Sequence, residues 1–107
     1  MRYFEEALAI RKELKDQYPE NPEYRQNYSV SLKRIGDIYK AQDQPEEALK
    51  YYKESLTIWK ELKDRYPENL FNLAVYLLLL NKIGGVYEAM DQPEVALEYY
   101  EDRKSVV

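Results

Sequence analysis

The chain contains one nearly unbroken apolar run, LAVYLLLL at residues 73–80, whereas its other apolar residues are spaced apart. Elsewhere they recur every three or four residues, which is the spacing of one face of a helix. Tyr52, Leu56, Trp59 and Leu62 form one such stripe. With the turn residues between the stripes, this pattern predicts five helices, at about residues 3–18, 22–42, 45–66, 70–90 and 93–104.

Prolines mark the expected helix ends. Pro45 and Pro93 suit the first position of a helix, where a missing N–H costs nothing, and acidic residues follow both of them. Tyr18 and Tyr66 each precede a proline, which disfavours the helical conformation, so we expect two helices to end there. Asn21, directly before Pro22, has the side chain of a helix N-cap.

The chain repeats itself with a period of 48 residues. When residues 1–59 are paired with 49–107, 27 of the 59 pairs are identical. AIRKELKDQYPEN at 9–21 returns as TIWKELKDRYPEN at 57–69, and RIGDIYKAQDQPEEALKYY at 34–52 returns as KIGGVYEAMDQPEVALEYY at 82–100. A fixed period of this length indicates stacked helical units that bury their apolar faces against one another.

The conserved spacing within each copy resembles the tetratricopeptide repeat, with its pattern W-x2-L-G-x2-Y, then A-x3-F, then P. The two copies of the signature are Leu32, Ile35, Gly36, Tyr39, Ala48, Tyr52 and Leu80, Ile83, Gly84, Tyr87, Ala96, Tyr100. The resemblance implies an all-α, right-handed superhelical stack of antiparallel helix hairpins. It would form one domain over 1–107, with five helices and two and a half repeats. Residues 1–21 would be the second helix of a partial repeat, 22–69 a full repeat, and 70–107 a repeat truncated in its second helix.

Two departures from the family pattern affect the geometry. The period exceeds the family's 34 residues by two heptads, which lengthens each helix without rotating its apolar face, as in long-helix variants of the repeat. Asp43 and Asp91 stand between the paired helices where the family usually has glycine. We expect Gly36 and Gly84 to allow close helix approach, with Ala48 and Ala96 as their small partners.

The function implied by the resemblance is that of a non-catalytic protein–protein interaction scaffold, which binds a protein or peptide on its concave face. The alternative is a structural or oligomerisation segment of a larger multi-repeat signalling or effector protein. By position in the repeat, the groove residues are Val30, Lys33, Asp37, Lys40, Ala74, Leu78, Asn81 and Glu88.

The apolar run makes the predicted helix 70–90 apolar on nearly every side, which implies burial beyond the usual core stripe. We expect a partly uncovered patch there, composed of Leu73, Val75, Leu77 and Leu79. Three explanations remain open at this point: a following repeat of a longer array, a second copy of the chain in a homodimer through this helix, or an apolar partner helix or peptide.

Composition narrows the function classes. The net charge of −4 disfavours binding to nucleic acid or an anionic membrane, and the run of residues 73–80 is too short to span a bilayer. The chain has neither cysteine nor histidine, and its paired carboxylates stand at helix starts without calcium-loop spacing. We therefore expect no metal, no cofactor, no enzymatic activity, and a cytoplasmic location.

Overall fold

The structure is a computed structural model that describes residues 1–106, with side chains described as far as Lys104. It is built from five helices, and each predicted helix is present with both ends within two residues of the expected ones. They are α1 (Arg2–Gln17), α2 (Pro22–Ala41), α3 (Pro45–Arg65), α4 (Leu70–Ala89) and α5 (Pro93–Val106).

The helix ends follow the expected chemistry. The Asn21 side chain accepts hydrogen bonds from the backbone N–H groups of Glu23 and Tyr24, which caps α2. Asn69 caps α4 in the same way, so the second copy keeps its cap although Leu70 replaces the proline. Tyr18 and Tyr66 leave the helical conformation, with φ of −127° and −128°, directly before their prolines.

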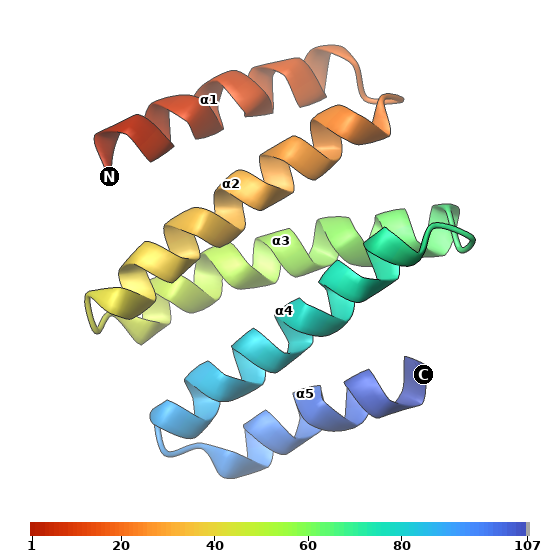
Figure 1. The fold of residues 1–107 in the computed structure, drawn as a ribbon. Coiled ribbons are helices and arrows are strands. Elements are labelled where there is room, and N and C mark those ends of the chain that lie inside the picture. Colours follow the sequence, from red (N-terminus) through yellow and green to blue (C-terminus); the bar gives the residue numbers. More distant parts are fainter. Residues whose placement is uncertain (107) are drawn as a thin grey trace.

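Consecutive helices form antiparallel hairpins stacked side by side (Figure 1). The helix α3 packs against both α2 and α4, while α1 packs on α2 and α5 on α4. In the view of Figure 1, α2 and α4 lie in front of α3 and run in the same direction. The Cα trace measures 40 × 36 × 15 Å, so the molecule is a thin slab whose two broad faces are both accessible.

The core is built from the repeat signature and from the apolar stripe of α3. Trp59, Tyr52 and Leu62 are fully buried side chains of α3. Around them lie buried residues of α2 and α4, including Leu32, Ile35, Leu80 and Ile83. Tyr39, Tyr87 and Tyr100 are half-buried, and the first two stack on Tyr51 and Tyr99 respectively.

The side chains next to two signature glycines differ from those predicted. A Cβ atom added at Gly36 would lie 2.7 Å from Cε1 of Tyr52, and one at Gly84 would lie 2.5 Å from Cε1 of Tyr100. Each glycine therefore leaves room for a tyrosine ring. The prediction that Ala48 and Ala96 are the facing partners is incomplete: the backbone oxygen of Ala48 would lie 3.3 Å from the Cβ added at Gly36, but the Tyr52 ring is closer, and at Gly84 the three nearest atoms all belong to Tyr100.

One residue of the predicted uncovered patch lies in the core. Leu79 is completely buried, so its assignment to an uncovered flank is wrong. One repeat earlier its counterpart is Ser31, which accepts a hydrogen bond of 2.6 Å from Arg11 of α1. The counterpart of Arg11 is Trp59, and Trp59 and Leu79 belong to one core cluster. This flank of the first helix of each hairpin thus faces the preceding helix, not a later one.

The replacement of Arg11 and Ser31 by Trp59 and Leu79 in the second copy leaves a buried donor without an acceptor. Among the residues that the structure describes, Nε1 of Trp59 is the buried side-chain polar atom without a hydrogen-bond partner. Leu79 stands where Ser31 supplies an acceptor one repeat earlier, so the indole N–H has no acceptor there. Burial of the large ring offsets the cost of the unpaired donor.

The turns between paired helices carry a small amount of backbone strain. Asp43 and Asp91 adopt left-handed conformations, with φ of 59° and 60°. Glycine adopts this conformation without the Cβ clash of other residues, and aspartate tolerates it better than alanine does.

We therefore predict that Asp43→Gly raises the free energy of unfolding by about 0.5 kcal/mol and that Asp43→Ala lowers it by a similar amount. Urea unfolding followed by circular dichroism checks both values. Gln42→Gly is the matched control, because φ of −89° at Gln42 gives glycine no advantage and the change should destabilise the fold. Equal effects of glycine at positions 42 and 43 would contradict the strain argument.

Candidate functional site

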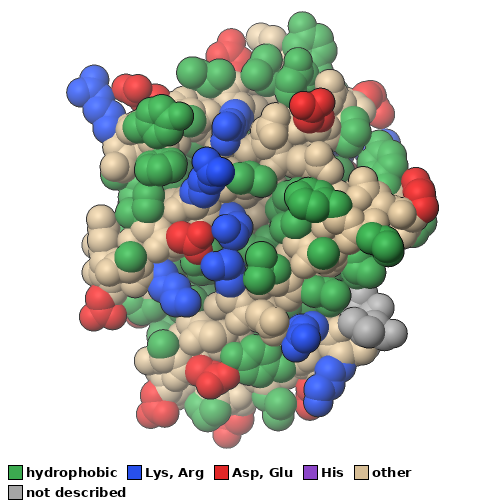
Figure 2. Space-filling model, in the orientation of Figure 1, with side chains coloured by type: hydrophobic (Ala, Val, Ile, Leu, Met, Phe, Trp, Pro, Cys, Tyr) green, Lys and Arg blue, Asp and Glu red, His purple; other side chains and the backbone are tan. Residues whose placement is uncertain are grey.

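The predicted groove residues lie on the outward side of α2 and α4, here called the α2–α4 face. Lys40, Ala74, Leu78 and Glu88 are exposed on this face. The other predicted groove residues are half-buried, namely Val30, Lys33, Asp37 and Asn81. In Figure 2 this face is turned to the viewer, with Lys and Arg side chains gathered over α2 and towards α4.

The carboxylate of Asp37 organises the centre of the face. Lys33 of the same helix and Lys82 of α4 each place Nζ 3.3 Å from an oxygen of Asp37. The buried Tyr52 of α3 donates its hydroxyl hydrogen bond to Oδ1. This Asp37 cluster joins three helices, and it holds two lysines whose remaining N–H donors are available to a ligand.

The cluster also controls the ionisation of Asp37. Burial by itself would raise the pKa of this carboxyl. The hydrogen bond from Tyr52 and the charges of Lys33 and Lys82 outweigh burial, so the pKa of Asp37 lies below its ordinary value. The face therefore carries an ionised Asp37 at neutral pH, and the two lysines neutralise it.

Sequence reasoning missed Lys82, which α4 contributes to this cluster. Its counterpart in α2 is Arg34, so a basic residue at the same position in both copies was the available signal. The rotation of about 100° between Asn81 and Lys82 placed Lys82 outside the predicted groove, but its long side chain reaches the acceptor on α2.

The second repeat rearranges the same positions. Gly85 takes the place of Asp37, and a Cβ added at Gly85 would meet nothing within 4 Å. Tyr100, the counterpart of Tyr52, donates its hydroxyl hydrogen bond to Glu88 instead. The carboxylate of Glu88 therefore faces α5 at one end of the α2–α4 face, and the opening at Gly85 remains uncharged.

The first half of α4 exposes apolar side chains. Leu70, Phe71 and Leu78 are 72%, 60% and 47% exposed, and Ala74 lies between them on the same side. The other predicted patch residues, Leu73, Val75 and Leu77, are half-buried. Figure 2 shows hydrophobic side chains gathered over this part of the molecule, beside the basic region.

Among the described residues, α4 is the helix long and apolar enough to cross a membrane by length and composition. The core helix of a water-soluble protein passes the same test. Here Asn72 is buried and accepts a 2.8 Å hydrogen bond from Gln26 of α2, and Lys82 pairs with Asp37. These polar contacts fix α4 in the helical stack.

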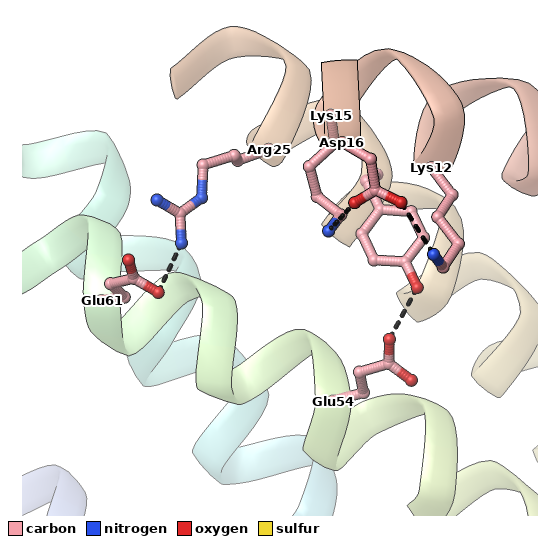
Figure 3. A network of polar contacts seen from close by, with 7 residues as sticks. Lys12, Lys15, Asp16, Arg25, Glu54 and Glu61 are labelled. Atoms are coloured by element: carbon pink, nitrogen blue, oxygen red, sulfur yellow. Dashed lines mark hydrogen bonds and ion pairs between the residues drawn. The ribbon is translucent and has the colours of Figure 1, made fainter. Parts of the chain in front are cut away.

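A second polar region lies on α1, α2 and α3 (Figure 3). Lys12 and Lys15 both contact Asp16 at 2.8 Å, Tyr28 donates a hydrogen bond of 2.6 Å to Glu54, and Arg25 pairs with Glu61. The groups satisfy one another, and Lys15 also lies over the ring of Tyr28. We interpret this network as support for the packing of α2 on its neighbours.

The ion pairs and tyrosine hydrogen bonds predict how stability changes with pH. Hydrogen bonds from Lys12 and Lys15 lower the pKa of Asp16 from 3.8 to about 2, and a hydrogen bond from Arg25 lowers the pKa of Glu61. A lowered pKa stabilises the fold above the unfolded value near 4, and this stabilisation is lost as pH falls through the folded value. Burial raises the pKa of Tyr28 and Tyr52, so their contribution is present below about pH 10 and lost above it.

We therefore predict a broad maximum of the unfolding temperature between about pH 5 and 9, with a fall towards pH 2 and another above pH 10. Thermal unfolding followed by circular dichroism at a series of pH values measures it. Asp16→Asn should reduce the fall of the unfolding temperature towards pH 2, whereas Asp43→Asn, at an exposed carboxyl that forms no ion pair within the described part of the chain, serves as control. An unfolding temperature independent of pH between 5 and 2 would contradict the prediction.

The comparisons with known proteins agree with this architecture. A family model described as the tetratricopeptide repeat matches residues 28–103, which is more than half of the chain. Neither the curated proteins nor the solved structures include a match.

Proposed function

Because the chain belongs to the tetratricopeptide repeat family, whose members serve as scaffolds for protein–protein interactions, we propose that it binds a partner protein through the α2–α4 face. The observation that carries this proposal is the contrast between two regions of the surface. The polar network of α1, α2 and α3 is internally satisfied. The α2–α4 face instead combines exposed apolar residues with basic side chains.

The distribution of side chains on this face suits recognition. Leu78 and Phe71 offer exposed apolar area of the kind that anchors a partner, whereas large exposed apolar patches are unusual on a protein surface without a ligand. Lys33 and Lys82 are held in place by Asp37, so a partner need not immobilise them on binding. Gly85 leaves open space beside them.

The test is an unbiased selection of displayed peptides against the complete chain, followed by mapping on the 15N-labelled protein. We expect the selected peptides to shift the amide signals of exposed residues in α2 and α4. Leu78→Arg should weaken their binding at least about tenfold. Ile10→Arg, at an aliphatic residue of α1 that is also exposed, should leave it unchanged. Shifts confined to α1 and α3 would overturn the proposal.

Self-association is a second candidate, favoured by the exposure of Leu70, Phe71 and Leu78 on one helix. In a homodimer the first half of α4 would be covered by a second copy of the chain. Light scattering over a concentration series, with Phe71→Glu as the variant, distinguishes this from partner binding. A concentration-dependent dimer that Phe71→Glu converts into a folded monomer would favour it, and a monomer at all concentrations would exclude it.

A further inference from the structure

The α2–α4 face is basic although the chain as a whole is acidic. The helices α2 and α4 carry five basic and three acidic side chains, a net charge of +2. The rest of the chain carries eleven basic and seventeen acidic side chains, a net charge of −6. The positive charge is therefore concentrated on the two helices that form the proposed binding face, and it favours a negatively charged partner.

The charged residues of this face differ in whether they already have a partner within the chain or are available to a ligand. Arg25 is paired with Glu61 of α3, whereas Glu88 accepts a hydrogen bond from Tyr100 of α5 and keeps its negative charge at one end of the face. Arg34 and Lys40 are exposed, and within the described part of the chain neither has an ion-pair or hydrogen-bond partner. They lie on the same helix as Lys33, and Asp37 is the acidic side chain among them.

The basic and apolar side chains occupy opposite halves of the face. The hydrogen bond between Gln26 and Asn72 and the ion pair between Asp37 and Lys82 show which positions of the two helices lie beside each other. Phe71 and Ala74 therefore lie beside the first half of α2, and Leu78 lies beside its middle. The basic residues Lys33, Arg34, Lys40 and Lys82 lie beside or on the second halves of both helices.

The separation of the two halves sets the length of a matching ligand. Eleven residues separate Phe71 from Lys82, which corresponds to about 16 Å along a helix at 1.5 Å per residue. An extended peptide covers this distance with about five residues. The basic side chains themselves extend over seven residues of α2, about 10 Å, which is enough for several carboxylates.

We propose that the α2–α4 face binds a short peptide segment whose apolar side chains are grouped at one end and whose side-chain carboxylates are grouped at the other. The apolar end lies on Phe71, Ala74 and Leu78, and the carboxylates lie on Arg34, Lys40 and Lys82. This inference rests on the proposed function and adds the chemistry and the order of the ligand. A terminal carboxylate is not required, because the basic residues are spread along the helices.

The probes are acetylated and amidated nonapeptides labelled with a fluorophore. One set carries Leu and Phe in the first four positions and Asp and Glu in the last four, a second set has the reverse order, and a third has the same composition with the two kinds alternating. A fourth set replaces Asp and Glu by Asn and Gln. Fluorescence anisotropy gives the affinity, and amide shifts of the labelled protein locate the contact.

One of the two segregated orders should bind at least about fivefold more tightly than the alternating peptide and than its Asn and Gln counterpart. The same segregated peptide made with a free C-terminal carboxylate should bind no more tightly than its amidated form. Arg34→Gln/Lys40→Gln should weaken this binding about tenfold, since both residues are exposed and unpaired. Lys50→Gln/Lys60→Gln on α3, with the same change of charge, is the matched control. Leu78→Ser should weaken binding, whereas Leu97→Ser on α5 should not.

Failure of this inference is distinguishable from failure of the proposed function. Equal binding of segregated, alternating and neutral peptides at the α2–α4 face would overturn the inference and leave the face a binding site. Dependence on a free terminal carboxylate, or a second copy that covers the face, would likewise overturn it. Absence of binding by every peptide, including those selected without bias, would overturn both.

Discussion

Leu79→Glu is expected to unfold the chain, whereas the same substitution at the neighbouring Leu78 is expected to leave it folded. Leu79 is completely buried in the cluster that contains Trp59 and Leu62. A carboxylate there would lose the apolar contacts of leucine and would also have to be desolvated or protonated without a partner. We expect a loss of at least about 4 kcal/mol, a large part of the 5–15 kcal/mol that stabilises a typical domain.

Leu78 is the matched control because it is the adjacent residue of the same type and is 47% exposed. A glutamate at this position reaches water, so we expect a change within about 1 kcal/mol. Circular dichroism and urea unfolding of both variants make the comparison. Equal stability of the two variants would place Leu79 on an outer flank of α4 and contradict its assignment to the core.

This pair of residues shows where the sequence was informative and where it was not. Proline, asparagine caps and apolar spacing specify the helix ends locally, so all five helices could be predicted. Inside residues 73–80, however, almost every side chain is apolar, and periodicity cannot indicate which of them face the core. The position of Leu79 was accessible only by comparison with Ser31, whose neighbour Arg11 becomes Trp59 one repeat later.

The candidate site was partly predictable for a similar reason. Positions equivalent within the repeat, such as Lys33 and Asn81, could be assigned to one face by their register on the helix. The Asp37 cluster could not be predicted in this way, because Tyr52 and Lys82 reach Asp37 from two other helices. Their approach depends on the distances between helices, which are fixed by core packing and not by spacing along the chain.

The exchange of Asp37 for Gly85 explains why the two repeats do not form identical sites. With no carboxylate at position 85, the hydroxyl of Tyr100 turns to Glu88, and no acceptor remains there to hold a second pair of lysines. The apolar first half of α4 also has no counterpart in α2, where Gln26 and Val30 stand in place of Ala74 and Leu78. The segregated surface therefore arises from divergence between the copies.

A second large loss of stability is expected at one of the glycines. Gly36→Ala should destabilise the fold by about 2–4 kcal/mol. The added methyl group would lie 2.7 Å from Cε1 and 2.8 Å from Cδ1 of the Tyr52 ring. This ring has no room to move, since it is fully buried and its hydroxyl donates to Asp37. Either the two helices separate or the ring leaves its pocket, and both lose packing contacts.

Gly84→Ala and Gly85→Ala test the cause of this effect. The methyl group at position 84 would meet the Tyr100 ring, but Tyr100 is only half-buried and can turn outward, so we expect a smaller loss of about 1–2 kcal/mol. At position 85 it would meet nothing within 4 Å, and the higher helix propensity of alanine should raise stability by up to about 1 kcal/mol.

Urea unfolding of the three variants checks this order, in which Gly85→Ala is the most stable and Gly36→Ala the least. A double-mutant cycle with Tyr52→Leu isolates the clash, because the smaller side chain should remove much of the cost of Gly36→Ala. Equal losses at positions 36 and 85 would show that helix flexibility, not the tyrosine ring, requires glycine. Since the same ring anchors Asp37, Gly36→Ala should also release Lys33 and Lys82, and peptide binding at the α2–α4 face should weaken even where the variant remains folded.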